Sequence, residues 1–136
     1  MISKSSKHAI LALACLAKLP REEYAGANHI AEEIKAPKNY LGKILNKLVA
    51  EGYLESVKGY NGGFRLSKPA SKISIYDIVD PIENLNKLNK CFLGVNKCSC
   101  RSTCAVHENW YKIRQDYMNF LKSTTLEMIT KTNIEI

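Results

Sequence analysis

The chain has 136 residues, of which 46% are apolar, and its formal net charge is +7. This length allows one compact domain with an appended helix and is too short for two independent cores. The longest apolar run, residues 9–17, is about half of the roughly 20 residues that a membrane-spanning helix needs, and the N-terminus lacks the pattern of a secretory signal. We therefore expect a cytoplasmic protein.

Basic side chains are concentrated in the first half of the chain, where residues 1–68 hold 11 basic and 6 acidic side chains. A lysine or arginine placed on a phosphate releases condensed counterions, so a basic surface favours a polyanionic partner. Charge on its own does not establish nucleic-acid binding, because many basic surfaces are merely solvated.

The cysteines are unevenly placed, since four of the five fall within residues 91–104. A reducing cytosol disfavours structural disulfides, so this clustering indicates metal binding or redox chemistry. Cys15 is different, because it lies within the apolar run, where a small thiol packs as an apolar core residue.

Three helices are predicted in the first half of the chain. Residues 3–19 form the first, with serine as its N-cap, and Asn28 is expected to cap a short second helix that Pro37 interrupts. A third helix, from about Lys38 to Ala50, buries one apolar stripe and leaves basic and amide side chains outside the core. Such a pair, joined by about three residues, is typical of a helix-turn-helix, whose second helix lies in the major groove of DNA.

A two-stranded wing is predicted next, over residues 53–66. Two short alternating runs flank Asn61 and Gly62, a pair typical of the tight hairpin turn that demands positive φ. Lys58 and Arg65 flank this turn, and its glycines let the backbone approach a phosphate closely.

Residues 67–103 are predicted to contain a connector, a short extended segment leading into a helix, and an irregular segment. After a polar connector at residues 67–71, residues 73–79 are expected to form a short strand or extended entry into a helix that ends near Pro81. Residues 87–103 should be irregular and ordered mainly by whatever their thiols bind.

A long helix is predicted from about Ala105 to Thr130. Its apolar residues recur at alternating spacings of 4 and 3, the pattern of a helix packed along another helix. We expect this seam to pack against a second copy in a two-fold dimer, with folding back onto the chain's own domain as the alternative. The seam residues are Val106, Trp110, Ile113, Tyr117, Phe120 and Thr124.

Together these elements predict a mainly α fold with a small β-hairpin wing: a winged helix-turn-helix with a long C-terminal dimerisation helix. The expected boundaries are 1–80 for the DNA-binding domain, 81–104 for a cysteine-rich loop, and 105–136 for the dimerisation helix and tail.

Several motifs, in this order, resemble those of the winged-helix repressors that include the iron-sulfur cluster regulator and the nitric-oxide-sensing repressor. The most specific are the Gly-x-x-Gly-Gly-Phe sequence at residues 59–64 and the cysteine spacing. Further matches lie at Ile30-Ala31-Glu32, Ala36-Pro37 with Tyr40-Leu41, Glu51-Gly52-Tyr53-Leu54 with Ser56, and residues 73–79. The resemblance covers nearly the whole chain.

The resemblance implies a double-stranded DNA operator, pseudo-palindromic to match a homodimer. It implies base reading near the start of the recognition helix by Lys38, Asn39, Tyr40 and Lys43. It also implies wing contacts by Lys58, Gly59, Tyr60, Asn61 and Arg65.

The resemblance further implies an iron-sulfur cluster held by Cys91, Cys98, Cys104 and His107, with 2Fe-2S favoured and 4Fe-4S as the alternative. The gap between Cys91 and Cys98 is one residue longer than the family's usual gap. Cys100 is an extra thiol that could replace Cys98. In some relatives a ligand comes from the partner's first helix, where His8 stands here, although a buried histidine is more often a hydrogen-bonded core residue.

The function expected is therefore a DNA-binding transcriptional regulator, most simply a repressor, whose operator affinity follows the state of the cluster and so senses redox, nitric oxide or iron status. A regulator of the same fold could instead work as a thiol switch, through a zinc site, or through a protein partner. A ferredoxin-like carrier would need no helix-turn-helix. An enzyme is not expected, because the sequence shows no phosphate loop, activated nucleophile or carboxylate pair.

Overall fold

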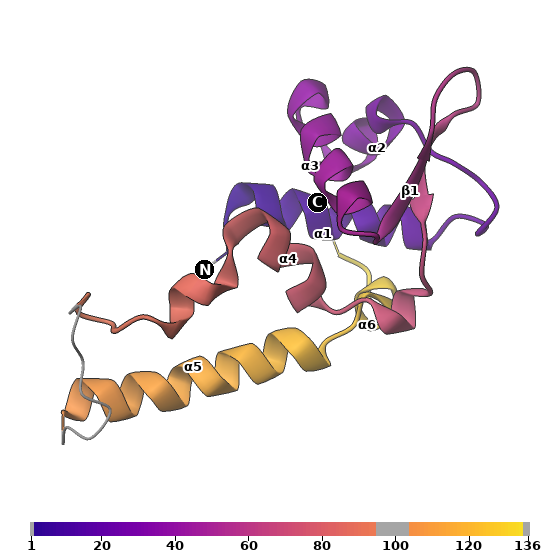
Figure 1. The fold of residues 1–136 in the computed structure, drawn as a ribbon. Coiled ribbons are helices and arrows are strands. Elements are labelled where there is room, and N and C mark those ends of the chain that lie inside the picture. The colour runs from indigo at the N-terminus through magenta and orange to yellow at the C-terminus, as the bar shows by residue number, and fades with distance from the viewer. Residues whose placement is uncertain (1, 95–103, 135–136) are drawn as a thin grey trace.

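Helices dominate the part of the chain that this computed structural model describes, residues 2–94 and 104–134. A single two-stranded antiparallel hairpin follows the third helix (Figure 1), so the mainly α fold with a small hairpin is confirmed. The elements are α1 (Lys4–Ala17), α2 (Ala27–Ile34), α3 (Lys38–Ala50), β1 (Leu54–Val57), β2 (Gly63–Leu66), the 3₁₀ helix η1 (Ala70–Lys72), α4 (Ile75–Glu83), the 3₁₀ helix η2 (Leu85–Asn89), α5 (Ala105–Ser123) and α6 (Leu126–Thr130).

Helix α1 lies at the centre of the main core and contacts α2, α3, α4, α6 and β2. It starts where predicted, because the Ser3 hydroxyl accepts the Ser6 backbone N–H at 3.0 Å as an N-cap. Ala9 and Ala12 are fully buried, and their small side chains let neighbouring helices approach. The apolar run of residues 9–17 thus supplies the central helix against which α2, α3 and the wing pack.

The helix-turn-helix has the expected second helix but a different start to the first. Helix α3 spans the predicted residues, whereas α2 is capped by Gly26, and Asn28 lies inside it. The reason is a backbone bridge between Ala25 and Phe64, which holds the chain extended up to Gly26 and lets the helix begin immediately after it.

The wing is a hairpin, as predicted, but its turn is longer. Val57 pairs with Gly63, so five residues, 58–62, form the loop instead of a two-residue turn. Asn61 has the positive φ of 62° that its type tolerates. A Cβ at Gly62 would overlap the carbonyl oxygen of Val57, so this glycine serves the closure of the wider loop.

Helix α4 corrects the expectation for residues 73–81. A capping box starts it, with the Asp77 N–H on the Ser74 hydroxyl at 3.1 Å and the Ser74 N–H on the Asp77 carboxylate at 3.0 Å. The extended portion is therefore limited to the residues just before the cap. The helix runs past Pro81 to Glu83, so the proline stands in its last turn instead of ending it.

The C-terminal helix was expected to be continuous to Thr130, but it breaks at Thr124. Ser74 and Thr125 form an antiparallel bridge, in which Ile75 N–H donates to Thr124 O at 2.9 Å and Leu126 N–H to Ile73 O at 2.8 Å. Helix α6 then turns back onto α1. Pairing with another segment of backbone thus competes with helix continuation at this point.

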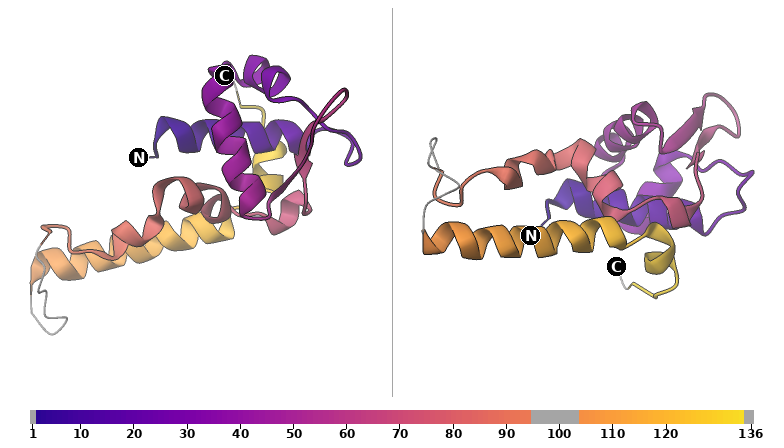
Figure 2. Two further views of the ribbon diagram at one scale, coloured as in Figure 1. Left: turned by 45° about the horizontal axis from the view of Figure 1, so that its top comes forward. Right: turned by 60° about the horizontal axis from the view of Figure 1, so that its bottom comes forward.

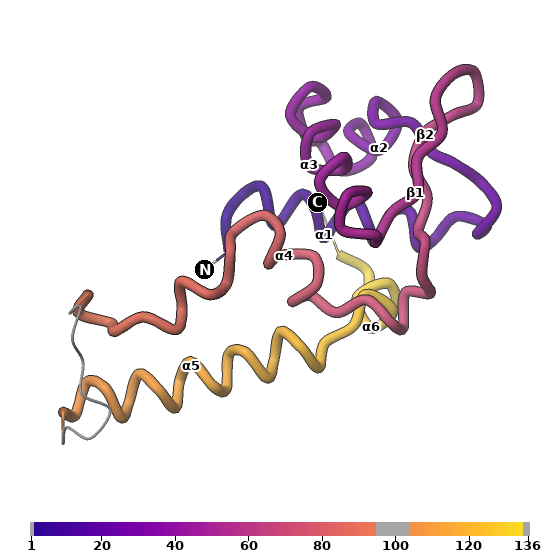
Figure 3. The backbone as a smooth tube through the Cα atoms, viewed as in Figure 1, coloured from indigo at the N-terminus to yellow at the C-terminus, as the bar shows by residue number. Residues whose placement is uncertain are grey.

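Helix α5 extends away from the main core, and the chain between α4 and residue 94 runs back alongside it (Figures 2 and 3). A second, small apolar cluster joins these segments, made of Ile75, Val79, Leu85 and Leu121. Leu121 is the one fully buried side chain of α5, and it lies near the helix's C-terminal end. Across residues 2–94 and 104–134, no helix is long and apolar enough to cross a membrane.

Candidate nucleic-acid interface and cysteine site

The exposed face of α3 is basic and rich in amides. Lys38, Asn39 and Lys43 are exposed, while Leu41 and Leu45 point into the core at 0% exposure. Lys38 pairs with the exposed Glu32 of α2 at 3.6 Å, an interaction that solvent screens. The same face continues through Asn46 and Lys47, which the helical spacing places beside Asn39 and Lys43.

Tyr40 stands apart from its neighbours because it is half-buried and held by α1. Its hydroxyl lies 3.1 Å from His8 Nδ1, and the two rings meet edge to face at 5.5 Å between centroids. His8 itself is 7% exposed. Burial lowers the pKa of His8, with Lys7 and Lys4 adding to the effect, so the imidazole is neutral at neutral pH. The structure thus shows a hydrogen-bonded core histidine in direct contact with the recognition helix.

The tip of the wing is open to solvent. Lys58, Gly59, Tyr60 and Asn61 are all exposed, and the Tyr60 side chain is 97% exposed. The wing loop and α3 stand on the same side of α1, facing away from α5 (Figure 1). These two elements, which lie on the same side of the molecule, therefore contain eight of the nine residues expected to contact DNA.

Arg65, the ninth, lies at the base of the wing instead of its tip. It is the cross-strand partner of Glu55, and its Nε donates to Glu55 Oε2 at 2.8 Å. Its guanidinium also lies over the Tyr24 ring, 4.5 Å from the centroid. Arg65 thus braces the hairpin against the segment before α2.

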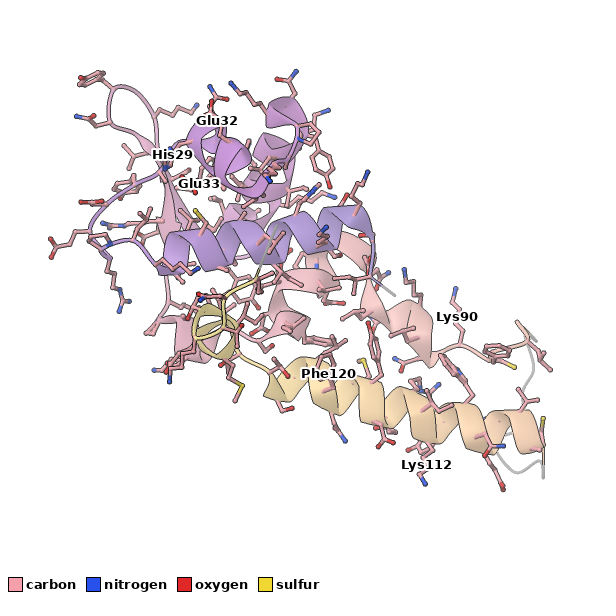
Figure 4. All side chains as sticks on the ribbon, turned by 180° about the vertical axis from the view of Figure 1, so that it is seen from behind. His29, Glu32, Glu33, Lys90, Lys112 and Phe120 are labelled. Carbon is pink, nitrogen blue, oxygen red and sulfur yellow. The ribbon has the colours of Figure 1, made fainter. Side chains whose placement is uncertain are left out.

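The candidate cluster ligands that the structure describes gather at the far end of α5. Cys91 follows η2 and is half-buried, Cys104 is the exposed N-cap residue of α5, and His107 lies in that helix's first turn. Lys90 lies toward this same end, whereas Phe120 lies nearer the main core (Figure 4). Cys98 and Cys100 lie outside the described residues.

Contacts from α5 hold the Cys91 segment in place. Trp110 Nε1 donates to Lys90 O at 3.1 Å, and Arg114 Nη1 donates to Leu88 O at 3.3 Å. Sequence reasoning assigned Trp110 to a dimer seam and gave Arg114 no role. The sequence feature that favours this contact is the spacing of Trp110 and Arg114, which lie one helical turn apart after His107.

Cys91, Cys104 and His107 are donors of the types that iron-sulfur clusters use, and they lie on either side of residues 95–103 in the sequence. Within residues 2–94 and 104–134, no three His, Cys, Asp or Glu side chains come close enough to hold a metal ion. One of the four expected ligands, Cys98, and the alternative ligand Cys100 belong to the remaining segment. His29 of α2 is exposed, and its Nε2 lies 4.0 Å from Glu33 Oε1, away from this end of the molecule.

The outer face of α5 carries exposed apolar side chains beside a cavity. Ile113 is 59% and Phe120 53% exposed. The cavity, of about 210 Å³, opens between α5 and the Glu83–Leu88 stretch and is lined by Leu85, Leu88, Trp110, Ile113, Arg114 and Tyr117. The predicted seam is therefore divided, since Trp110 and Tyr117 contact their own chain while Val106, Ile113 and Phe120 face outward.

Comparison with known proteins identifies the family. The Rrf2 family, described as iron-dependent transcriptional regulators, matches residues 2–132. An HTH-type transcriptional regulator of Aquifex aeolicus (strain VF5) is 35% identical over 129 residues, which cover 93% of this chain and 89% of that protein.

Solved structures agree with this assignment. CymR, the global cysteine regulator of B. subtilis, superposes with a TM-score of 0.80 at 25% identity, over 98% of each chain. IscR of T. potens has the same fold, with a TM-score of 0.77 at 22% identity, over 96% of this chain and 86% of that one. The chain belongs to the Rrf2 family of DNA-binding transcriptional regulators and is not an enzyme.

Proposed function

We propose that this regulator is a homodimeric repressor whose affinity for a pseudo-palindromic operator is controlled by an iron-sulfur cluster at the Cys91 end of α5. The observation that carries the DNA-binding part is the shared surface of α3 and the wing tip, within a chain of the Rrf2 family. The cluster part is supported by the gathering of Cys91, Cys104 and His107 at one end of the molecule.

On DNA, the start of α3 enters the major groove. Asn39 and Tyr40 are best placed by type to bond base edges, while Lys38 and Lys43 contact phosphates or guanine. Lys58, Gly59, Tyr60 and Asn61 approach the neighbouring backbone or minor groove, and Arg65 adds positive charge at the base of the wing.

A second copy is the partner that the outward face of α5 fits best. Val106, Ile113 and Phe120 are apolar and exposed, and the cavity beside Ile113 offers space for side chains of a partner helix. Two recognition helices related by a two-fold axis would then read half-sites about one turn of DNA apart. An Ile113→Asp variant should shift the dimer to monomer in analytical ultracentrifugation, whereas Lys112→Ala, on an exposed neighbouring position, should not.

At the cysteine end, Cys91, Cys98, Cys104 and His107 would hold a 2Fe-2S cluster, and Cys100 could replace Cys98. In a 4Fe-4S cluster the fourth ligand would be His8 of the partner subunit, which would have to leave its hydrogen bond to Tyr40. Such a cluster would supply redox activity, and it would respond to oxidants, to nitric oxide and to the supply of iron. The chain's own part is to present sulfur and imidazole ligands there. Joint ligation by Cys91 and the start of α5 ties the two segments together and so sets the tilt of α5 beneath the DNA-reading elements.

A thiol switch without a cluster is the second candidate, because CymR of Staphylococcus aureus, which shares this fold over 99% of its chain, has a solved oxidised form. In that mechanism, a disulfide among the loop cysteines orders the same segment. A zinc ion held by Cys98, Cys100, Cys104 and His107 would order it without redox chemistry of the metal, and a protein partner would order it through surface contacts.

Anaerobic purification with visible absorption, iron and sulfide analysis tests the cluster. We expect a brown protein with about two iron atoms per chain, and loss of colour in Cys91→Ser and Cys104→Ser variants but not in Cys15→Ser. A colourless protein that stays iron-free after reconstitution would overturn the cluster mechanism. Reduced and oxidised apo-protein, compared on the same operator, would then test the thiol switch.

A further inference from the structure

The chain between α4 and Cys91, most of which is the 3₁₀ helix η2, is held by three side-chain hydrogen bonds. Leu85 N–H donates to Asp80 Oδ1 at 2.9 Å, at the exit from α4. The carbonyl of Leu88 accepts from Arg114 Nη1 at 3.3 Å, and that of Lys90 accepts from Trp110 Nε1 at 3.1 Å. The last of these lies on the residue directly before Cys91.

The residue directly after Cys91 contacts the same tryptophan. The rings of Phe92 and Trp110 lie 5.5 Å apart between centroids, tilted by 55°. One side chain of α5 therefore touches both neighbours of Cys91. The segment runs antiparallel to α5, with residue 88 opposite 114 and residue 90 opposite 110. The chain at Cys91 therefore continues toward the N-terminal end of α5, where His107 lies in the first turn (Figure 3).

We propose that Trp110 is a positioning residue for Cys91, and that it fixes the distance between this thiol and the Cys104–His107 end of α5 before any cluster is bound. Arg114 supports it from the next turn. The inference rests on the proposed function only for the statement that Cys91 is a ligand. A preset thiol position lowers the ordering cost of ligation and constrains the geometry around the bound iron.

The indole N–H distinguishes this role from simple packing. Any large apolar side chain could fill the space beside Leu88, but tryptophan also supplies a donor to a carbonyl that has left regular secondary structure. Trp110→Phe keeps an aromatic ring against Phe92 and removes the hydrogen bond. Trp110→Ala removes both contacts. Gln115→Ala is the matched control, since Gln115 is an exposed, uncharged residue of the same helix.

The first test uses full-length, reduced, cluster-free protein and measures the alkylation rate of Cys91 by iodoacetamide. Trypsin cleaves after Lys90 and Lys97, so a fragment with Cys91 as its one thiol can be quantified by mass spectrometry. We expect alkylation to accelerate about tenfold in Trp110→Ala and about threefold in Trp110→Phe, since opening of the segment is no longer opposed by these contacts. Gln115→Ala should match the wild type.

The second test measures the reduction potential and visible spectrum of the loaded protein. Trp110→Phe should shift both, and Gln115→Ala neither. Equal Cys91 alkylation in wild type and Trp110→Phe, with matching circular dichroism, would overturn the positioning role even if Trp110→Ala failed to fold. If the wild-type protein binds no iron but its Cys91 is still alkylated more slowly than that of Trp110→Phe, the cluster is refuted and the positioning role of Trp110 is retained.

Discussion

The two ends of this molecule are built on different physical terms. The DNA-reading end rests on a continuous core in which Leu13, Ile30, Leu41, Leu45 and Leu48 are all below 2% exposure. The cysteine end has the small cluster around Leu121 and, beyond it, single hydrogen bonds and ring contacts. The DNA-reading end is therefore held by buried apolar packing, whereas the cysteine end has few buried contacts of its own. Local stability of this uneven kind is common where a protein must respond to a signal.

The largest effect that would sharpen this comparison is a core truncation in the recognition helix. Leu45→Ala removes a fully buried side chain of α3 and should lower the free energy of unfolding by about 3 kcal/mol. Ile113→Ala, at 59% exposure on α5, should change it by less than about 0.5 kcal/mol at concentrations where the chain is monomeric. Urea unfolding of both variants checks the contrast, and similar losses would contradict it.

The next effect separates base reading from phosphate contact within the DNA surface. Asn39→Ala should cost about 1–3 kcal/mol on the specific operator and change the sequence preference, because an amide reads base edges. Lys58→Ala should weaken binding to specific and random DNA alike and lower the salt slope by about one unit. Salt titrations on both DNAs check this.

Arg65 refines that prediction, because its guanidinium is already engaged with Glu55. If Arg65→Ala lowers the salt slope like Lys58→Ala, the arginine contacts phosphate as well as bracing the wing. If Arg65→Ala leaves the salt slope unchanged, and Arg65→Ala and Glu55→Gln both lower the thermal stability of the protein, the role of Arg65 is structural.

The smallest effect concerns the contact between α1 and the recognition helix. Tyr40→Phe removes the hydrogen bond to His8 and should cost about 1 kcal/mol of stability. Since the pKa of His8 is lowered in the fold, the unfolded chain binds more protons below about pH 6.5, and stability falls as the pH drops through that value. His8→Gln should flatten this dependence in melts between pH 5 and 8, and an unchanged slope would refute it.

Much of the DNA-reading end could be predicted, because its elements follow local rules. The period of Leu41, Ile44, Leu45 and Leu48 defines α3, and Ser3 caps α1 as its type suggests. Errors arose where distant backbone pairs intervene. Ala25 with Phe64 moved the start of α2, and Ser74 with Thr125 divided the last helix. Neither pairing leaves a periodic trace in the sequence.

The candidate sites divide in the same way. The exposure of Lys43 and Lys58 follows from helix spacing and hairpin position. The pairing of Arg65 with Glu55 depends on the strand register, and the two-residue turn predicted from Asn61-Gly62 gave the wrong register. The apolar seam of α5 could be found by its period, but a period does not say which partner a side chain meets. Trp110 turns to its own chain because a carbonyl at Lys90 lies within reach of its N–H.

The anchoring of α5 at Thr124 makes the helix a lever. Two backbone hydrogen bonds hold its C-terminal end against Ile73 and Ile75, and its 19 residues reach about 28 Å to Cys104. A rotation of about 5° at the anchor sweeps the cysteine end through roughly 2 Å. In the opposite direction, a displacement of roughly 2 Å at Cys104 corresponds to a rotation of only about 5° at the anchor. A large displacement at the cysteine end therefore reaches the segment beside α1 as a small rotation, on the order of a few degrees.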